Sequence, residues 1–141
     1  MKNLKILAGL LIFGSTLMIS CSKEDNQGPG TNVLNIVNQG NWRFALYNDS
    51  GVDETNHYTG YTFTFSNGTV TAVKNASTVT GTYSTIFDDS KNKLVLNFGV
   101  TVPFDELNDD WHILEETATR VRLQDVSGGS GQTDLLTFEK N

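Results

Sequence analysis

The sequence predicts an all-β domain, an eight-stranded antiparallel meander closed into a barrel and preceded by a short helical turn. From Asn41 onward the chain is rich in Thr, Val, Phe and Tyr, which favour strands. Clusters of Gly, Asn and Asp interrupt it about every eight to twelve residues, a spacing typical of β-sandwiches and barrels. Because Cys21 is the only cysteine, packing rather than disulfides must hold the domain together.

The first 20 residues have the pattern of a secretory signal peptide. Lys2 and Lys5 supply positive charge, and an almost unbroken apolar run follows over residues 6–18. The run is too short to span a bilayer. We therefore expect residues 1–20 to be removed when the protein is exported.

Cys21 ends the segment LMISC (17–21), which resembles a bacterial lipobox. The resemblance implies cleavage before Cys21 and a lipid on its sulfur. A disulfide would need a second cysteine, and a thiolate zinc site would need further ligands at a set spacing. The alternative is a plain secretion signal followed by an incidental cysteine. Residues 22–26 look like the export signal of Bacteroidota surface lipoproteins, which implies an anchored position in the outer membrane, on the cell surface; the alternative is an ordinary solvated run of charged residues.

The charge of the chain argues against some partners. Removing residues 1–20 takes away two of the ten Lys and Arg and none of the 16 Asp and Glu, which leaves eight against 16, a formal charge of −8. This balance argues against nucleic acids and against adhesion to anionic headgroups, so the lipid on Cys21 must hold the membrane alone. Residues 21–32 form the predicted flexible tether, with a random-coil reach of about 18 Å.

The predicted domain, residues 33–141, begins with a helical turn. Val33, Ile36 and Val37 recur at helical spacing, Asn32 is a candidate N-cap, and Gly40 can end the turn. A helix this short needs tertiary contacts to survive. We expect it to plug one end of the barrel.

Eight strands follow, and their pairing can be tested at the turns. Asn67-Gly68 suits a two-residue type I′ hairpin that sets Phe65 opposite Val70 and Phe63 opposite Ala72. The strands are predicted over residues 41–48, 58–66, 69–75, 77–87, 92–99, 110–116, 119–125 and 133–140.

Two later turns extend this pattern. A turn at Asn75-Ala76 places Val79, Gly81 and Tyr83 on the same inner face. Near residue 117, a three-residue loop with a bulge aligns Ile113 with Val121 and Trp111 with Leu123, whereas a two-residue turn would set apolar side chains against arginines.

The segment Gly40-Asn41-Trp42, at the entry to the first strand, resembles the Gly-x-Trp signature of lipocalins and other calycins. The stretches GYTFTFSNGTV (60–70) and DELNDDWHILEETATRVRL (105–123) look like lipocalin-like domains of small Bacteroidota lipoproteins. The resemblance covers about 100 residues and implies a barrel. In calycins an arginine packs across this tryptophan, and Arg120 and Arg122 are the candidates here.

No motif for catalysis is present, and we expect no enzymatic activity, no cofactor and no metal site. His57 and His112 lie far apart in sequence without a zinc-like spacing. The acidic residues Asp105, Glu106, Asp109 and Asp110 offer oxygens of the kind that calcium takes, but the EF-hand pattern is missing and a solvated loop is the simpler interpretation.

The predicted function is binding of a small apolar or amphipathic ligand in, or at the mouth of, the barrel by a monomeric protein. Tyr61 opposite Lys74 would hold an anionic head group at the end opposite the helix. The alternative is a side-chain-filled barrel that binds a protein or glycan through its loops, with Tyr47, Tyr58 or Phe104 exposed. The predicted ligand site comprises Trp42, Tyr61, Phe63, Phe65, Lys74, Tyr83, Phe98 and Trp111.

Overall fold

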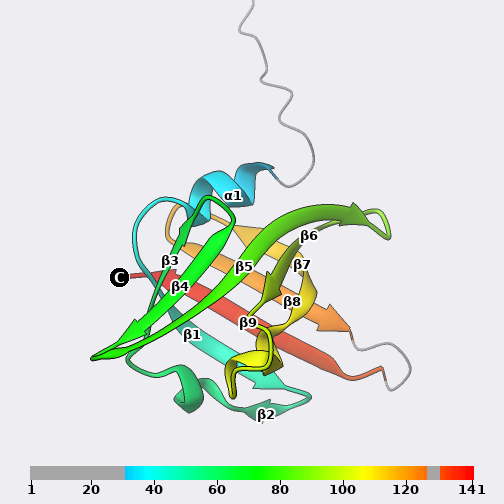
Figure 1. The fold of residues 1–141 in the computed structure, drawn as a ribbon. Helices are drawn as coiled ribbons and strands as arrows, with labels where there is room; N and C mark the ends of the chain where they lie inside the picture. The colour runs from blue at the N-terminus through cyan, green and yellow to red at the C-terminus, as the bar shows by residue number, and fades with distance from the viewer. Residues whose placement is uncertain (1–30, 127–130) are drawn as a thin grey trace, which may run out of the picture.

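The computed structural model describes residues 31–126 and 131–141, so the predicted signal peptide and Cys21 lie outside the described residues. The chain forms a barrel with a short helix at one end (Figure 1). Its elements, in order, are α1 (Thr31–Val37), β1 (Trp42–Asp49), β2 (Val52–Asp53), the 3-10 helix η1 (Thr55–Tyr58), β3 (Thr62–Ser66), β4 (Thr69–Lys74), β5 (Ser77–Asp88), β6 (Lys91–Asn97), the 3-10 helix η2 (Phe104–Leu107), β7 (Asp109–Glu116), β8 (Arg120–Val126) and β9 (Thr133–Lys140).

The predicted eight-stranded antiparallel barrel is confirmed. Strands β3 to β9 pair in sequence order, and β1 closes the barrel by pairing with β9 along its length. On its other side β1 meets β3 at a single pair, Trp42 with Phe63. The two-residue strand β2 is an addition at the far end of β1.

The first two predicted hairpins are confirmed residue by residue. Phe65 pairs with Val70 and Phe63 with Ala72, and the connecting residues Asn67 and Gly68 have φ of 51° and 79°, as a type I′ turn requires. Lys74 then pairs with Ser77 across the Asn75-Ala76 turn, which sets Ala72 opposite Val79.

The register predicted for β7 and β8 is wrong by two residues. Ile113 pairs with Leu123 rather than Val121, because Ala118 and Thr119 form the turn and a bulge falls between Ile113 and Glu115. The bulge itself was predicted, but not its position. The extra residue, Leu114, is left exposed on the surface.

A second bulge, between Phe44 and Leu46, changes which residues of β1 face the barrel interior. Strict alternation from Trp42 and Phe44 would place Leu46 inside the barrel. The extra residue of the bulge exchanges the inward and outward positions that follow it, so Tyr47 is buried instead. The predicted start of β3 at residue 58 is also wrong. Tyr58 belongs to η1, and Gly60, at φ 85°, turns the chain before the strand begins.

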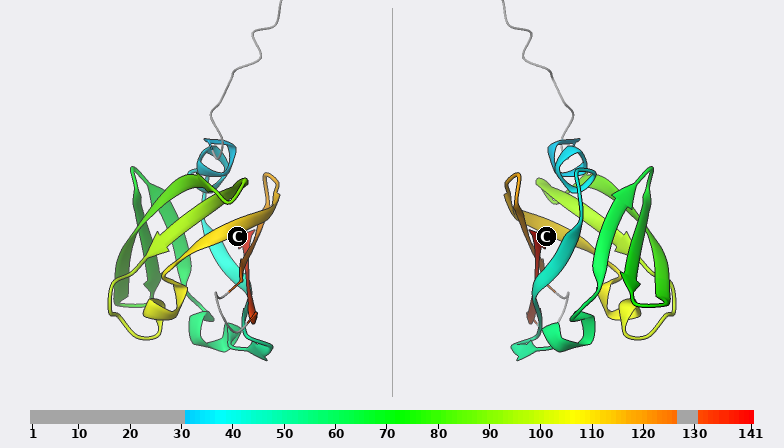
Figure 2. Two further views of the ribbon diagram at one scale, coloured as in Figure 1. Left: turned by 90° about the vertical axis from the view of Figure 1, so that its right-hand side faces the viewer. Right: turned by 90° about the vertical axis from the view of Figure 1, so that its left-hand side faces the viewer.

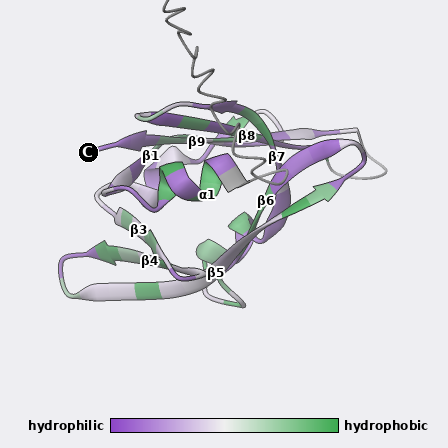
Figure 3. Cartoon of the chain, turned by 90° about the horizontal axis from the view of Figure 1, so that it is seen from above, coloured by the Kyte–Doolittle hydropathy of each residue, from purple (hydrophilic) through white to green (hydrophobic). Residues whose placement is uncertain are grey.

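The short helix α1 lies across one end of the barrel, as predicted (Figure 3). Val33 and Val37 are fully buried in the core. Asn32 is within the helix rather than at its N-cap, and its amide donates to Glu116 at 2.6 Å. The Trp42 indole N–H donates to the Val37 carbonyl at 2.9 Å, so a barrel residue satisfies the helix C-terminus. Within the described residues, no helix is long and apolar enough to cross a membrane.

Candidate functional site

The predicted ligand residues form the packed interior of the barrel. Six of the eight are buried, with at most 6% of each residue exposed: Trp42, Phe63, Phe65, Tyr83, Phe98 and Trp111. Phe63 stacks on Phe44 with ring centroids 4.2 Å apart, and Phe138 meets the edge of Phe44 at 4.7 Å. Side chains therefore occupy the centre of the barrel, which is one of the two outcomes open to an eight-stranded barrel.

The other two predicted residues meet at the rim. The Lys74 ammonium lies 5.4 Å from the centre of the Tyr61 ring, a cation–π contact that the predicted hairpin register implies. Tyr61 is only partly buried, and its ring meets Phe104 at 5.1 Å. The sequence therefore placed these two side chains together correctly, while their binding role stays a prediction.

The barrel end opposite α1 is closed by η1 and η2 (Figure 2). Tyr58 and Phe104 are buried there, with ring centroids 5.5 Å apart, and Leu107 is fully buried beside them. The Trp111 indole N–H donates to the Leu107 carbonyl at 3.0 Å. Exposure of Tyr47, Tyr58 or Phe104, which would have favoured the loop-mediated alternative, is not observed: all three are buried, Tyr58 and Phe104 from the two short helices and Tyr47 from β1.

Two tyrosine hydroxyls link these closing segments. Tyr58 donates to the Pro103 carbonyl at 2.8 Å, and Tyr47 donates to the Glu106 carbonyl at 3.2 Å. Burial, more than the nearby acidic side chains, raises the pKa of both tyrosines well above its ordinary value of 10.0. Both hydroxyls therefore stay protonated and act as fixed hydrogen-bond donors.

Strand β5 extends beyond its neighbour β4 and therefore has a stretch of backbone edge that β4 does not cover. The pairing of β4 with β5 ends at Thr69 and Thr82, and the Gly68 carbonyl accepts the Tyr83 N–H at 3.0 Å. From residue 84 to 88, β5 pairs with β6 alone among the described strands. We call residues 84–88 the free edge.

Alternate backbone groups of the free edge point away from β6. Successive residues of a strand direct their N–H and C=O groups to opposite sides. Because the Tyr83 N–H points to the β4 side, Thr85 and Phe87 do the same, and neither has a backbone partner there in the described part of the chain. Phe87 is 60% exposed, so the edge also carries an apolar side chain.

A surface groove of about 400 Å³ runs beside the free edge. It lies where α1, the β3–β4 turn and β5 meet, in the same part of the barrel end that Figure 3 shows from above. Its lining residues are Leu34, Asn38, Asn67, Gly68, Tyr83, Ser84 and Thr85. The Tyr83 hydroxyl donates to the Asn38 amide oxygen, which ties the helix to the strand. The sequence contained an indication of this edge, because the strand predicted over residues 77–87 is longer than its neighbour predicted over residues 69–75.

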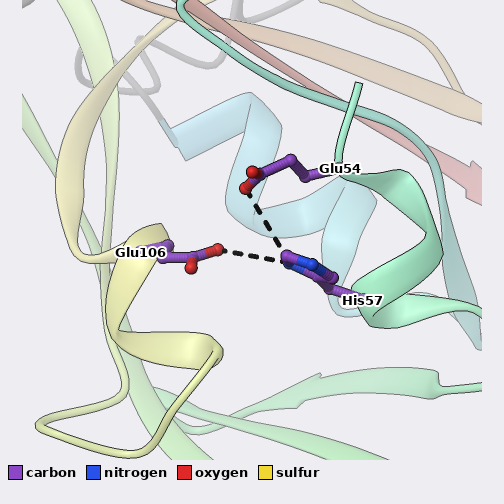
Figure 4. A group of neighbouring side chains, drawn as sticks. All are labelled: Glu54, His57 and Glu106. Atoms are coloured by element: carbon purple, nitrogen blue, oxygen red, sulfur yellow. Dashed lines mark ion pairs between the residues drawn. The ribbon is translucent and has the colours of Figure 1, made fainter. Parts of the chain in front are cut away.

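At the opposite end, η1 and η2 bring together Glu54, His57 and Glu106 (Figure 4). His57 Nδ1 lies 3.8 Å from Glu54 Oε2 and 3.6 Å from Glu106 Oε2. This group was missed in the sequence because Glu106 lies 49 residues after His57 and no spacing motif connects them.

The acidic residues considered for calcium do not form one site. Glu106 belongs with His57, whereas Asp109 and Asp110 lie near Asp125. The Lys93 ammonium donates to Asp110 at 2.9 Å and so neutralises that second group in part. Burial raises the pKa of Asp109 above its ordinary value of 3.8.

Comparison with known proteins supports the fold and no more. No protein-family model matches the chain, and no curated protein matches it. A similar solved structure is the crystal structure of a DUF4847 family protein from Bacteroides vulgatus, with a TM-score of 0.51 and 18% sequence identity. The match covers 77% of this chain and 97% of that one. The chain thus shares a barrel fold with a Bacteroides protein.

Proposed function

We propose that this chain is a lipid-anchored surface protein that binds an extended segment of a partner protein along the free edge. The observation that carries the proposal is the row of unpaired backbone groups on β5, beside the groove at α1. An extended segment that adds to a sheet edge gains main-chain hydrogen bonds, and pockets for alternate side chains supply specificity. This is the interaction-module function, exercised through a strand edge rather than through loops.

The chemistry of the partner follows from the edge. Thr85 and Phe87 together offer two N–H donors and two C=O acceptors, and five strand residues span about 17 Å. Side chains of an added strand that point inward would meet Leu34 and Phe87, so we expect apolar residues at alternate positions of the partner segment. Proteins usually protect such an edge with a charge, a proline or a bulge, but the free edge contains no proline, and its one charged residue, Asp88, stands at its last position.

The membrane anchor rests on the sequence alone. The lipobox-like segment at residues 17–21 and the export-signal-like segment at residues 22–26 support lipidation of Cys21 and a surface location. Several acyl chains, at about 0.8 kcal/mol for each buried methylene, give durable anchoring.

Site-specific crosslinking in cells tests the interaction. Once Cys21 carries lipid, Ser84→Cys provides the only free thiol, at the groove, and a thiol-linked photo-crosslinker can be attached there. We expect a covalent adduct with another protein from Ser84→Cys and none from Val100→Cys, a matched control at a 93% exposed position. Adding Thr85→Pro should abolish the adduct, since proline removes an N–H from the edge but not from the ladder with β6.

Several outcomes would overturn the proposal. They are an adduct of two copies of this chain, an equal adduct from Val100→Cys, no adduct at all, or an adduct that survives Thr85→Pro. Circular dichroism of the proline variant, with a melting temperature close to that of the parent, serves as the folding control.

The ligand-binding function remains the second candidate because Tyr61 and Lys74 do meet at the rim. Ligand binding requires either that the packed aromatic side chains move to open a cavity, or that the ligand bind on the outer surface of the closed barrel end. A fluorescent fatty acid titrated into the Cys21→Ser protein separates the two functions. Saturable binding weakened by both Tyr61→Ala and Lys74→Glu would favour the lipocalin-like ligand binder. We expect no saturable binding.

A further inference from the structure

The group Glu54, His57 and Glu106 has an unbalanced charge. Two carboxylates share one imidazole, and among the described residues no Lys or Arg lies within ion-pair distance of either glutamate. The second acidic group, at Asp109, Asp110 and Asp125, differs because Lys93 supplies a cation to Asp110. The first group therefore has two negative charges that no fixed cation offsets.

The separations within the group suit a shared ion better than direct bonding. At 3.6 and 3.8 Å, His57 Nδ1 is too far from the carboxylate oxygens for a hydrogen bond. Zn²⁺ binds imidazole nitrogen and carboxylate oxygen at about 2.0–2.2 Å in a tetrahedron, so its ligand atoms lie about 3.3–3.5 Å apart. The three ligand atoms lie within 4.8 Å of one another, so rotations of the partly exposed side chains can bring them to that spacing.

The protein holds the supporting segments in place. The buried Tyr58 follows His57 directly, and its hydroxyl lies 2.8 Å from the Pro103 carbonyl and 3.3 Å from Glu106 Oε2. One residue thus fixes η1 against η2 and orients a carboxylate. Second-shell hydrogen bonds of this kind orient metal ligands and tune their affinity.

We propose that Glu54, His57 and Glu106 bind a divalent transition-metal ion, with Zn²⁺ the best match. The imidazole selects against Ca²⁺ and Mg²⁺, which prefer oxygen ligands. Three protein ligands leave a fourth position for water or an external ligand. The site lies at the barrel end opposite α1 and does not depend on the free edge.

A zinc titration of the full chain carrying Cys21→Ser, which removes the only thiol, tests the site. The chain has two histidines, so the imidazole NMR signals of His57 and His112 can be followed separately. We expect one Zn²⁺ per chain, with the His57 signal shifting and the His112 signal unchanged. His57→Ala should abolish binding, and Glu106→Gln should weaken it by about tenfold or more.

His112→Ala is the matched control and should bind Zn²⁺ like the parent. Tyr58→Phe, which keeps the ring and removes the hydroxyl, should weaken binding by about tenfold. The proposal is overturned if the dissociation constant exceeds about 1 mM, if the His57 signal does not move, or if His112→Ala removes the binding. The NMR titration is done on the chain with Glu54, His57 and Glu106 unchanged, so it tests zinc binding even if the His57 variant folds poorly.

Discussion

His112, on the outer face of β7, lies near Lys91 and Lys93 in a pocket that also contains Asp89, Asp110 and Asp125. It pairs with Lys93 across the sheet and with Gln124 on the other side. The predicted pairing of Ile113 with Val121 would instead set Arg122 opposite His112, and the shifted register of β7 and β8 accounts for the difference. Desolvation first, and then Lys91 and Lys93, lower the pKa of His112 below its ordinary value of 6.5.

This lowered pKa makes stability depend on pH in a defined direction. The unfolded chain takes up a proton at His112 more readily than the folded one, so stability falls as pH drops below about 6.5 and stops falling below the folded pKa. We expect His112→Gln to lose less stability than the parent between about pH 8 and about pH 5. Urea unfolding at both pH values measures this, and an equal or larger loss in the variant would contradict it.

Lys140 is the cation that covers Trp42, with its ammonium 5.6 Å from the ring centre. The family resemblance predicted Arg120 or Arg122 instead, but both arginines pair with Glu115 on the barrel surface. The sequence showed that Trp42 would be central. It did not show which cation reaches the ring, because that depends on how the last strand registers against the first.

The β3–β4 hairpin needs glycine at position 68 for its backbone conformation, and not because a side chain there would lack room. A Cβ at Gly68 would meet its nearest atom, the Tyr83 carbonyl oxygen, at 3.9 Å, which is ordinary contact. The cost of a substitution there comes from the positive φ of 79°. This hairpin can therefore test the turn without disturbing the core.

We expect Gly68→Val to lower the free energy of unfolding by about 1–2 kcal/mol, because a β-branched residue resists positive φ. Gly68→Asn is the matched control and should retain most of the stability, since asparagine tolerates this conformation. Thermal or urea unfolding measures both. Equal stability of the valine and asparagine variants would argue against a type I′ turn.

The elements that could be predicted from the sequence are those whose pattern is local. The Asn67-Gly68 turn and the alternation around Phe63 and Phe65 determined three strands and their register. The bulge after Phe44, and the position of the bulge after Ile113, could not be predicted, because both depend on the curvature of the closed sheet. The same limit applies to the sites. The predicted strand lengths already implied that β5 extends beyond β4. The proximity of His57 and Glu106 could not be predicted, because it depends on how the folded chain brings η1 and η2 together.

At the scale of the molecule, α1 and the two 3-10 helices close opposite ends of a filled barrel (Figures 1 and 2). The first described residue, Thr31, lies at the α1 end, which is also the end of the free edge. A lipid on Cys21, as proposed, would join the domain through the α1 end, the same end that carries the free edge. Proteins held at the same membrane would then lie within reach of the free edge.

We expect Cys21→Ser to move the protein from the membrane fraction to the soluble fraction, because the serine oxygen cannot form the thioether that carries the lipid. Metabolic labelling with palmitate measures the modification directly, and Ser20→Gly, which keeps a small residue before the cleavage point, is the control that should remain labelled. Label on the serine variant, or a parent protein without label, would contradict the lipobox interpretation.

The pairing of the first strand with the last has a consequence for biosynthesis. Trp42 and Phe44 of β1 find their partners in Lys140 and Phe138 of β9, so the barrel cannot close until almost the entire chain has been made. A chain still attached to the ribosome therefore exposes β1 and much of its aromatic interior. If the chain is exported as proposed, passage through a translocation channel requires an unfolded polypeptide, and this topology delays folding until β9 has been made. The same circular closure that shuts the finished barrel would then favour passage across a membrane.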